Sequence, residues 1–193
     1  FIEIDTGNFK FKKKRYWSLR VGSEPMSRIY AREKVFDILS RSISEQMISD
    51  VNVGFFLSGG VDSSAVVCLA AKMGYSISSY SIGFNEKSHD ESYFSKLVAK
   101  HVQSKHISQK FIPDLSQNIF DFVREKYDEP FADSSQIPTH LVSKLAREHV
   151  TVALTGDGGD EIFGGYTRYA VGHLLDRAMR TPLLLRSFCS GVL

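Results

Sequence analysis

The chain has 193 residues, of which 42% are hydrophobic and 24% charged, a balance typical of one globular domain with a sizeable core. The formal net charge is only +2, so charge gives no argument for a nucleic-acid ligand. No apolar run approaches the roughly 18 residues that cross a bilayer. No secretory signal opens the chain, and its two cysteines favour a reducing compartment. We therefore expect a cytoplasmic protein with no membrane or nucleic-acid partner.

The first 50 residues predict a hairpin followed by a helix. Residues 1–23 alternate polar and apolar positions with aromatic residues among them, as in a strand or hairpin leading into a linker. The basic cluster at 10–15 is more typical of a solvated segment than of a phosphate-backbone site. From 25 to 50 the apolar residues recur at three- and four-residue steps, which predicts one helix face: Phe36, Leu39, Ile43 and Met47.

Strands and helices then alternate along the chain. The predicted strands cover 51–57, 77–84, 105–111 and 150–156. The predicted helices cover 61–73, 88–102, 113–127 and a segment through Leu141 and Leu145. Such alternation implies βαβ units, in which parallel strands are joined by right-handed crossovers. The predicted fold class is therefore α/β, a doubly wound parallel sheet with helices on both faces.

The helix predicted at 88–102 has two local signals. Ser88-x-x-Glu91 is a capping-box pattern that places the helix start at Ser88. Phe94, Leu97, Val98 and His101 follow along one stripe of this helix.

The first glycine-rich loop, "SGGVDSS" at 58–64, follows a predicted strand and opens a helix. Gly59 and Gly60 allow positive φ and a close approach of an anion to the backbone, and the helix N-terminus favours phosphate. Asp62 would repel phosphate unless Mg²⁺ lies between them. A tight turn in which Asp62 only caps the helix remains an open alternative. Three serines add hydroxyl donors: Ser58, Ser63 and Ser64.

The second loop, "TGDGGDE" at 155–161, places three glycines and three carboxylates in seven residues. Asp157, Asp160 and Glu161 would repel one another without a cation or a basic ligand group. The alternative is a solvated turn with acids in the first turn of a helix. In open parallel sheets ligands bind beyond the carboxyl ends of the strands, so we expect both loops at the same rim.

These residues resemble a known family. "FLSGGVDSS" is similar to the SGGxDS pyrophosphate-binding motif of the N-type ATP pyrophosphatases, which have an adenine nucleotide alpha hydrolase-like fold. "SIGF…HDES", "DEPFADSSQIPTHLVSKLA" and especially "LTGDGGDEIFGGY" resemble the glutamine-hydrolysing asparagine synthetases within that superfamily. The resemblance covers roughly residues 25–170.

The resemblance implies a role for each matching position. The adenosine part of ATP is expected at Leu57 and Ile82, and the whole ATP-binding set is Leu57, Ser58, Gly59, Gly60, Asp62, Ser63, Ser64, Ile82, Thr155 and Gly156. Asp157 is linked to forming the acyl-adenylate, and Asp62 and Asp160 are expected to hold Mg²⁺ on pyrophosphate. Candidate substrate contacts are Asp133, Ser134 and Glu161.

The implied reaction is the ATP-dependent amidation of aspartate to asparagine. It passes through β-aspartyl-AMP, releases AMP and pyrophosphate, and takes ammonia from glutamine through an N-terminal glutaminase domain. Because no cysteine stands near Phe1, we expect 1–23 to be a remnant of that domain and its linker, and 24–193 to be a synthetase domain truncated on its C-terminal side. Such a fragment is expected to bind ATP weakly or to be inactive. The apolar stretch "PLLLRSF" favours aggregation or a homodimer.

Two other functions remain open at this stage. A related amidotransferase would share the ATP chemistry but act on another carboxylate, such as one on a surface polysaccharide precursor. A non-catalytic nucleotide-sensing domain would keep only the fold, and the intact Asp62, Asp157 and Asp160 argue against it.

Overall fold

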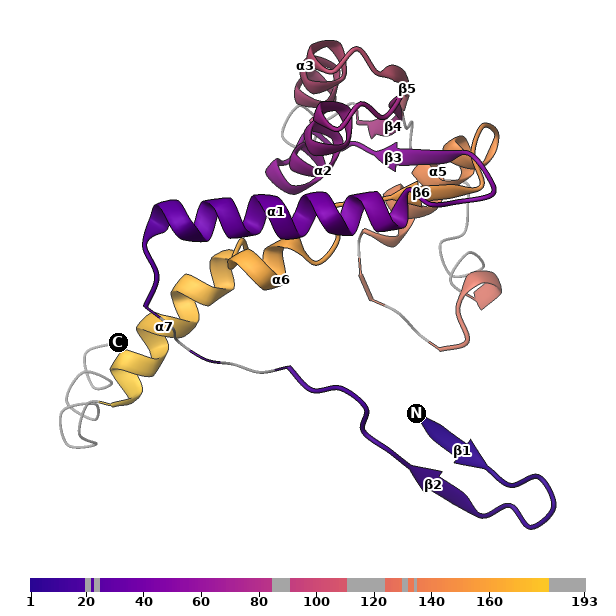
Figure 1. Cartoon of the computed structure of the whole chain (residues 1–193), viewed down its shortest axis with the longest axis vertical. Helices are drawn as coiled ribbons and strands as arrows, with labels where there is room; N and C mark the ends of the chain where they lie inside the picture. Colours follow the sequence, from indigo (N-terminus) through magenta and orange to yellow (C-terminus); the bar gives the residue numbers. More distant parts are fainter. Residues whose placement is uncertain are drawn as a thin grey trace. The chain divides into compact units, whose positions relative to one another are not determined.

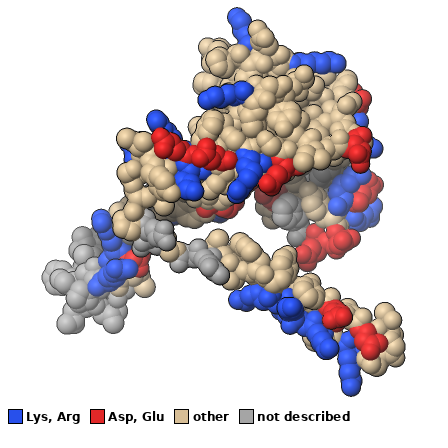
Figure 2. Space-filling model, in the orientation of Figure 1, with Lys and Arg blue, Asp and Glu red and all other residues tan. Residues whose placement is uncertain are grey.

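The computed structural model describes residues 1–19, 22, 25–84, 91–110, 124–129, 132–133 and 135–180. It divides into two compact units, Phe1–Phe36 and Asp37–Leu193. The smaller unit holds an antiparallel hairpin of strands β1 (Ile2–Ile4) and β2 (Phe11–Lys13), both exposed along their length. Basic side chains gather on this hairpin (Figure 2). The hairpin and its solvated basic segment are as the sequence predicts.

A four-stranded parallel sheet forms the centre of the larger unit (Figure 1). Its order is β5-β4-β3-β6, with β3 at Val53–Phe56, β4 at Ser78–Gly83, β5 at Lys105–Lys110 and β6 at Val152–Leu154. The chain moves outward from β3 to β4 and β5, then returns to place β6 on the other side of β3. This reversal of direction is the position where open α/β sheets bind ligands, and the parallel pairing confirms the predicted fold class.

Helices cover both faces of the sheet (Figure 1). One face packs against α1 (Arg28–Gln46), α2 (Val61–Lys72) and α3 (Ser92–His101), whose buried Ile43, Val67 and Ala99 join Phe55 and Leu57 in one core cluster. The opposite face packs against α5 (Gln136–Arg147), where Leu145 and Ala146 meet Tyr80 and Val150. The short α6 (Gly159–Phe163) and then α7 (Thr167–Met179) follow β6. In the described part of the chain, none of the helices has the length and apolar character that crossing a membrane requires.

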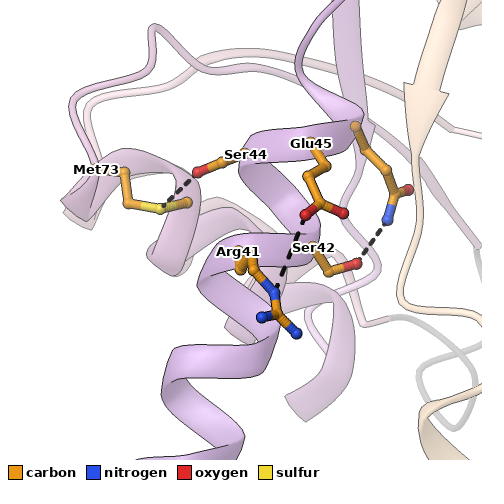
Figure 3. A network of polar contacts seen from close by, with 6 residues as sticks. Arg41, Ser42, Ser44, Glu45 and Met73 are labelled. Carbon is orange, nitrogen blue, oxygen red and sulfur yellow. Dashed lines mark hydrogen bonds and ion pairs between the residues drawn. The ribbon is translucent and has the colours of Figure 1, made fainter.

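The contact between α1 and α2 follows the C-terminal end of the predicted stripe on α1, while Phe36 at its start is exposed. Ile43 is 4% exposed, and Met47 packs against the same cluster. Beside this stripe, the Ser44 hydroxyl donates to the Met73 sulfur at 3.5 Å, just beyond the end of α2 (Figure 3). The Arg41–Glu45 ion pair lies on the outer side and is largely exposed, so it adds little stability.

The predicted stripe on α3 is only partly right, because Val98 packs against the core cluster but its neighbours in the stripe do not. Phe94 and Leu97 are each 55% exposed, whereas Ser95 and Ala99 are buried. The reason is a close approach: a Cβ on Gly59 would lie 2.6 Å from the backbone nitrogen of Ser95. Only small side chains let α3 lie this near the turn and the serines of β4, and this contact outweighs the apolar periodicity.

The predicted boundaries of α3, and of the helix expected at 113–127, can be compared with the structure only in part. The regular part of α3 begins at Ser92 with Glu91 as its N-cap, so Glu91 does not lie inside the helix as the capping box required. The predicted start at Ser88 lies outside the described residues. Most of the helix predicted at 113–127 also lies outside them.

A polar network is buried between β4, β5 and α3. The Ser79 hydroxyl, on a residue with 0% exposure, lies 2.6 Å from the Ser104 hydroxyl and 2.8 Å from His106 Nδ1. The other ring nitrogen of His106 lies 3.2 Å from the Ser81 hydroxyl. Burial, and then the positive charge of Lys96, lower the pKa of the His106 imidazole from its usual 6.5.

This network predicts a loss of stability in mild acid. Because folding lowers the pKa of His106, the unfolded chain takes up a proton first as the pH falls below 6.5. The free energy of unfolding should therefore decrease as the pH falls from 6.5 toward the lower folded-state pKa of His106. Urea unfolding followed at several pH values measures this slope. His106→Asn should flatten it, while His101→Asn, at an exposed position, should leave it in place.

Candidate functional site

The two glycine-rich loops leave the sheet side by side. β3 and β6 are parallel neighbours, with Phe55 opposite Leu154, and each loop follows one of these strands. A Cβ on Gly159 would lie 2.6 Å from Oδ2 of Asp62, and a Cβ on Gly156 would lie 2.6 Å from the Ser63 nitrogen. The two loops are therefore in contact, which confirms the prediction that they share one rim.

The first loop is a hydrogen-bonded turn. Gly59 has a φ of +99°, which a residue with a side chain rarely adopts. The Ser58 hydroxyl accepts a hydrogen bond from the Gly60 nitrogen at 3.1 Å and lies 3.0 Å from the Ser63 hydroxyl. The Ser64 hydroxyl is buried, with no hydrogen-bond partner among the described residues. Of the three predicted serine donors, Ser58 and Ser63 thus join the turn and Ser64 does not.

A cavity of about 340 Å³ opens where the two loops meet. The loops contribute Asp62 and the run from Thr155 to Gly159, so four predicted site residues line it: Asp62, Thr155, Gly156 and Asp157. The rest of the wall is mostly apolar and comes from α1, α2, β6 and α6.

Sequence reasoning missed two polar residues in the same cavity. Ser42 and Gln46 of α1 line it, and the Gln46 amide donates to the Ser42 hydroxyl at 2.9 Å (Figure 3). Their spacing in the sequence could have revealed them, because Ser42 and Gln46 lie one helical turn apart beside the apolar stripe of α1.

A second, smaller hollow brings the predicted adenosine positions together. Leu57 and Ile82 line a cavity of about 190 Å³ with Ser58 and Tyr80. Its apolar walls suit a flat ring. The far wall comes from α5, whose residues the sequence did not single out: Pro138, Thr139 and Val142.

The acidic loop continues into a turn that holds two of its carboxylates. Gly164 has a φ of +71° and ends α6, and the Asp160 carboxylate lies directly against Gly165. The Tyr166 hydroxyl donates to Oε1 of Glu161 at 2.7 Å. This hydrogen bond, more than the nearby charge of Arg168, lowers the pKa of Glu161. Asp62 thus packs on Gly159 and Asp160 on Gly165, while Glu161 is held by Tyr166.

Asp133, another predicted substrate contact, lines neither of these two cavities. Asp133 is exposed and accepts a hydrogen bond from the Ser135 nitrogen at 2.8 Å, which lowers the pKa of its carboxyl group. Ser134 lies outside the described residues. Within the described ranges, no group of three His, Cys, Asp or Glu side chains is arranged to hold a metal ion, so any cation at this rim needs further ligands.

A family model described as asparagine synthase matches residues 34–191, which include both loops. The chain belongs to the asparagine synthase family. Among its relatives are a provisionally named asparagine synthetase [glutamine-hydrolyzing] 2 of Methanocaldococcus jannaschii and the asparagine synthetase [glutamine-hydrolyzing] 1 of Bacillus subtilis. The first is 37% identical over 95% of this chain and 36% of its own length, and the second 38% over 81% and 23%.

The chain thus spans about a quarter to a third of the length of these family members. Among solved structures, an NH3-dependent NAD synthetase from Campylobacter jejuni superposes with a TM-score of 0.47. It is 17% identical in sequence, and the superposition covers 69% of this chain and 60% of that one.

The two adjacent glycines of the first loop provide a matched test of its geometry. A Gly59→Ala side chain would meet the Ser95 nitrogen and would require a positive φ. We expect it to lower the free energy of unfolding by about 1–3 kcal/mol. Gly60 has a φ of −65°, and the nearest atom to its Cβ would be the Ser58 hydroxyl at 3.3 Å. Gly60→Ala should therefore cost less than about 0.5 kcal/mol. Urea unfolding compares the two variants, and equal losses would contradict the close approach of α3.

Proposed function

We propose that the protein uses ATP to convert aspartate to asparagine through a β-aspartyl-AMP intermediate, with ammonia taken from glutamine. Membership of the asparagine synthase family supports ATP-dependent amidation in general. The observation that carries the proposal further is the contact of the SGGVDSS turn with the TGDGGDE loop, which places Asp62 against Gly159. We place this reaction in the cytoplasm, and we place the source of ammonia in a glutaminase domain that precedes this part of the chain.

In the first step an oxygen of the aspartate side-chain carboxylate attacks the α-phosphorus of ATP. The bond from that phosphorus to the bridging oxygen breaks, and pyrophosphate leaves. The nucleophile is already an anion, so no base is needed, and the contribution of the protein is positioning and neutralisation of charge. The Ser58 and Ser63 hydroxyls, which now bond to each other at 3.0 Å, would turn to the phosphate oxygens. The adenine ring would occupy the hollow formed by Leu57 and Ile82.

The residues at the rim fit Mg²⁺ with pyrophosphate. Carboxylates are the side chains that Mg²⁺ prefers, and phosphate oxygens commonly complete its shell. Asp62 packs on Gly159 and Asp160 on Gly165, two positions where a Cβ would fill the space that the carboxylate occupies. We assign Asp62 and Asp160 as the ligands, and the cation would offset the charge of the departing pyrophosphate.

In the second step ammonia attacks the acyl carbon of β-aspartyl-AMP. The carbon–oxygen bond to AMP breaks, AMP leaves with that oxygen, and the nitrogen loses a proton to become the amide of asparagine. Asp157, which lines the cavity between the loops, is the carboxylate we assign to forming and holding the acyl-adenylate.

Exchange of labelled pyrophosphate into ATP tests the first step separately from the second. In the protein at its full natural length, we expect exchange that depends on aspartate and Mg²⁺. Exchange that needs a different carboxylic acid would reject aspartate and keep the adenylation chemistry. Absence of exchange with every acid tried would favour a nucleotide-sensing domain.

Asp62→Asn tests the proposed metal ligand. Replacing the charged carboxylate by an amide should lower the exchange rate about a hundredfold or more. The isosteric amide should keep the contact with Gly159, so the urea midpoint should change little. Asp176→Asn is the matched control, because Asp176 is paired with Arg180 on exposed α7. A fully active Asp62→Asn protein would refute the metal role.

A further inference from the structure

Aspartate, the proposed acceptor, needs a positively charged partner that the two loops do not supply. Aspartate has an α-carboxylate and an α-ammonium group in addition to the carboxylate that reacts. The TGDGGDE loop offers three acids, Asp157, Asp160 and Glu161, which suit the ammonium group and repel a carboxylate. The cavity between the loops has no basic residue in its lining. A separate cation close to the acidic loop is therefore needed for the α-carboxylate.

Arg168, in the first turn of α7, has the geometry of such a cation. Its guanidinium carbon lies 3.9 Å above the ring of Tyr166 and 5.9 Å from the centre of the Tyr169 ring. Stacking on an aromatic face holds the guanidinium plane and leaves the N–H groups at its edge free to donate. Arg168 is exposed, and no ion pair joins it to a carboxylate in the described part of the chain.

Tyr166 contacts both the Arg168 guanidinium and a carboxylate of the acidic loop. Its hydroxyl donates to Glu161 at 2.7 Å while its face carries Arg168, so one ring positions an acid and a base together. The Tyr166 and Tyr169 rings meet edge to face at 5.6 Å, which supports the arrangement from the other side. We call Glu161, Tyr166 and Arg168 the Arg168 platform.

The Arg168 platform lies close to the loop contact. α6 contains Glu161 and lies between the Gly158 cap and the turn that carries Tyr166, and it has only five residues, an axial length of about 7.5 Å at 1.5 Å per residue. The Asp160 carboxylate packs on Gly165, the residue just before Tyr166. The platform is thus connected to the acidic loop at two points.

Other basic residues are less suited to this role. Arg180, just beyond the end of α7, is engaged with Asp176 at 2.9 Å. Lys144 and Arg147 of α5 line a separate hollow with Val150–Ala153, at the beginning of β6 and not at the end from which the acidic loop leaves.

We propose that Arg168 binds the α-carboxylate of the amino-acid acceptor and so determines its specificity, a role that rests on the proposed function. The planar guanidinium can donate two parallel hydrogen bonds to a carboxylate. Glu161, held by Tyr166, is placed to take the α-ammonium group of the same substrate. Arg168 is thus a specificity residue for an acceptor that is both an acid and an α-amino acid.

The test compares acceptors and variants in the full-length protein, with pyrophosphate exchange as the assay. β-Alanine is aspartate without the α-carboxylate. The wild-type protein should prefer aspartate strongly. Arg168→Ala should raise the KM for aspartate about ten- to a hundredfold, the value of one charge-assisted bidentate contact. The KM for ATP should stay within about twofold, and the preference over β-alanine should fall by the same factor as aspartate binding.

Two further variants separate charge from geometry. Arg168→Lys keeps the charge but loses the stacked fork, so it should recover only part of the aspartate affinity. Arg180→Ala removes a charge that lies just beyond the same helix and is already paired, and it should leave both KM values unchanged.

The outcomes distinguish this inference from the function on which it rests. If the wild-type protein shows no aspartate-dependent exchange, the proposed function fails and the role of Arg168 fails with it. If the wild type exchanges but Arg168→Ala keeps its KM for aspartate and its preference over β-alanine, only the role of Arg168 is overturned. A parallel rise in the KM for ATP would also overturn it, because it would assign Arg168 to the phosphates.

Discussion

The rim of this sheet depends on close contacts between the backbone of one loop and the first turn of the next helix. Gly156 lies where a Cβ would collide with the Ser63 nitrogen, and Gly159 lies where a Cβ would collide with the Asp62 carboxylate. Any side chain at these two glycines would push the second loop away from α2. Because β3 and β6 are parallel neighbours, these contacts join the ends of two strands that are about 100 residues apart in the chain.

These contacts also concentrate negative charge. Asp62 packs on Gly159, Asp160 packs on Gly165, and Glu161 accepts a hydrogen bond from Tyr166. Acids gathered in this way repel one another unless cations lie among them. In the proposed chemistry this repulsion is offset in two places. Mg²⁺, bound with pyrophosphate, lies at Asp62 and Asp160, and the substrate ammonium and Arg168 lie at Glu161. The same turn of chain that gathers the acids, Gly164 to Tyr166, also places the one stacked guanidinium described beside them.

Particular elements show what sequence patterns predict well. The run VGFF is buried along much of its length, and only a central parallel strand makes such a run stable. The stripe on α1 was right at its C-terminal end, where Ile43 and Met47 meet the sheet core, whereas Phe36 is 40% exposed. On α3 only Val98 of the stripe packs on the core, since Gly59 and the serines of β4 approach so closely that Ser95 and Ala99 face inward. An apolar pattern shows which side chains would gain from burial, but it does not show whether the contact has room for them.

The sequence by itself determined the alternation of strands and helices, the two loops and their acids, and the family, because these depend on local composition and spacing. Only the tertiary structure decided which of those residues meet. In the structure Asp62 packs on Gly159, and Asp133 lies outside both cavities. Ser42 and Gln46 line one of the cavities. Arg168 stacks on Tyr166, the tyrosine that donates a hydrogen bond to Glu161. The reason is physical: contacts between distant segments depend on strand order and on the absence of a few Cβ atoms, neither of which a local pattern records.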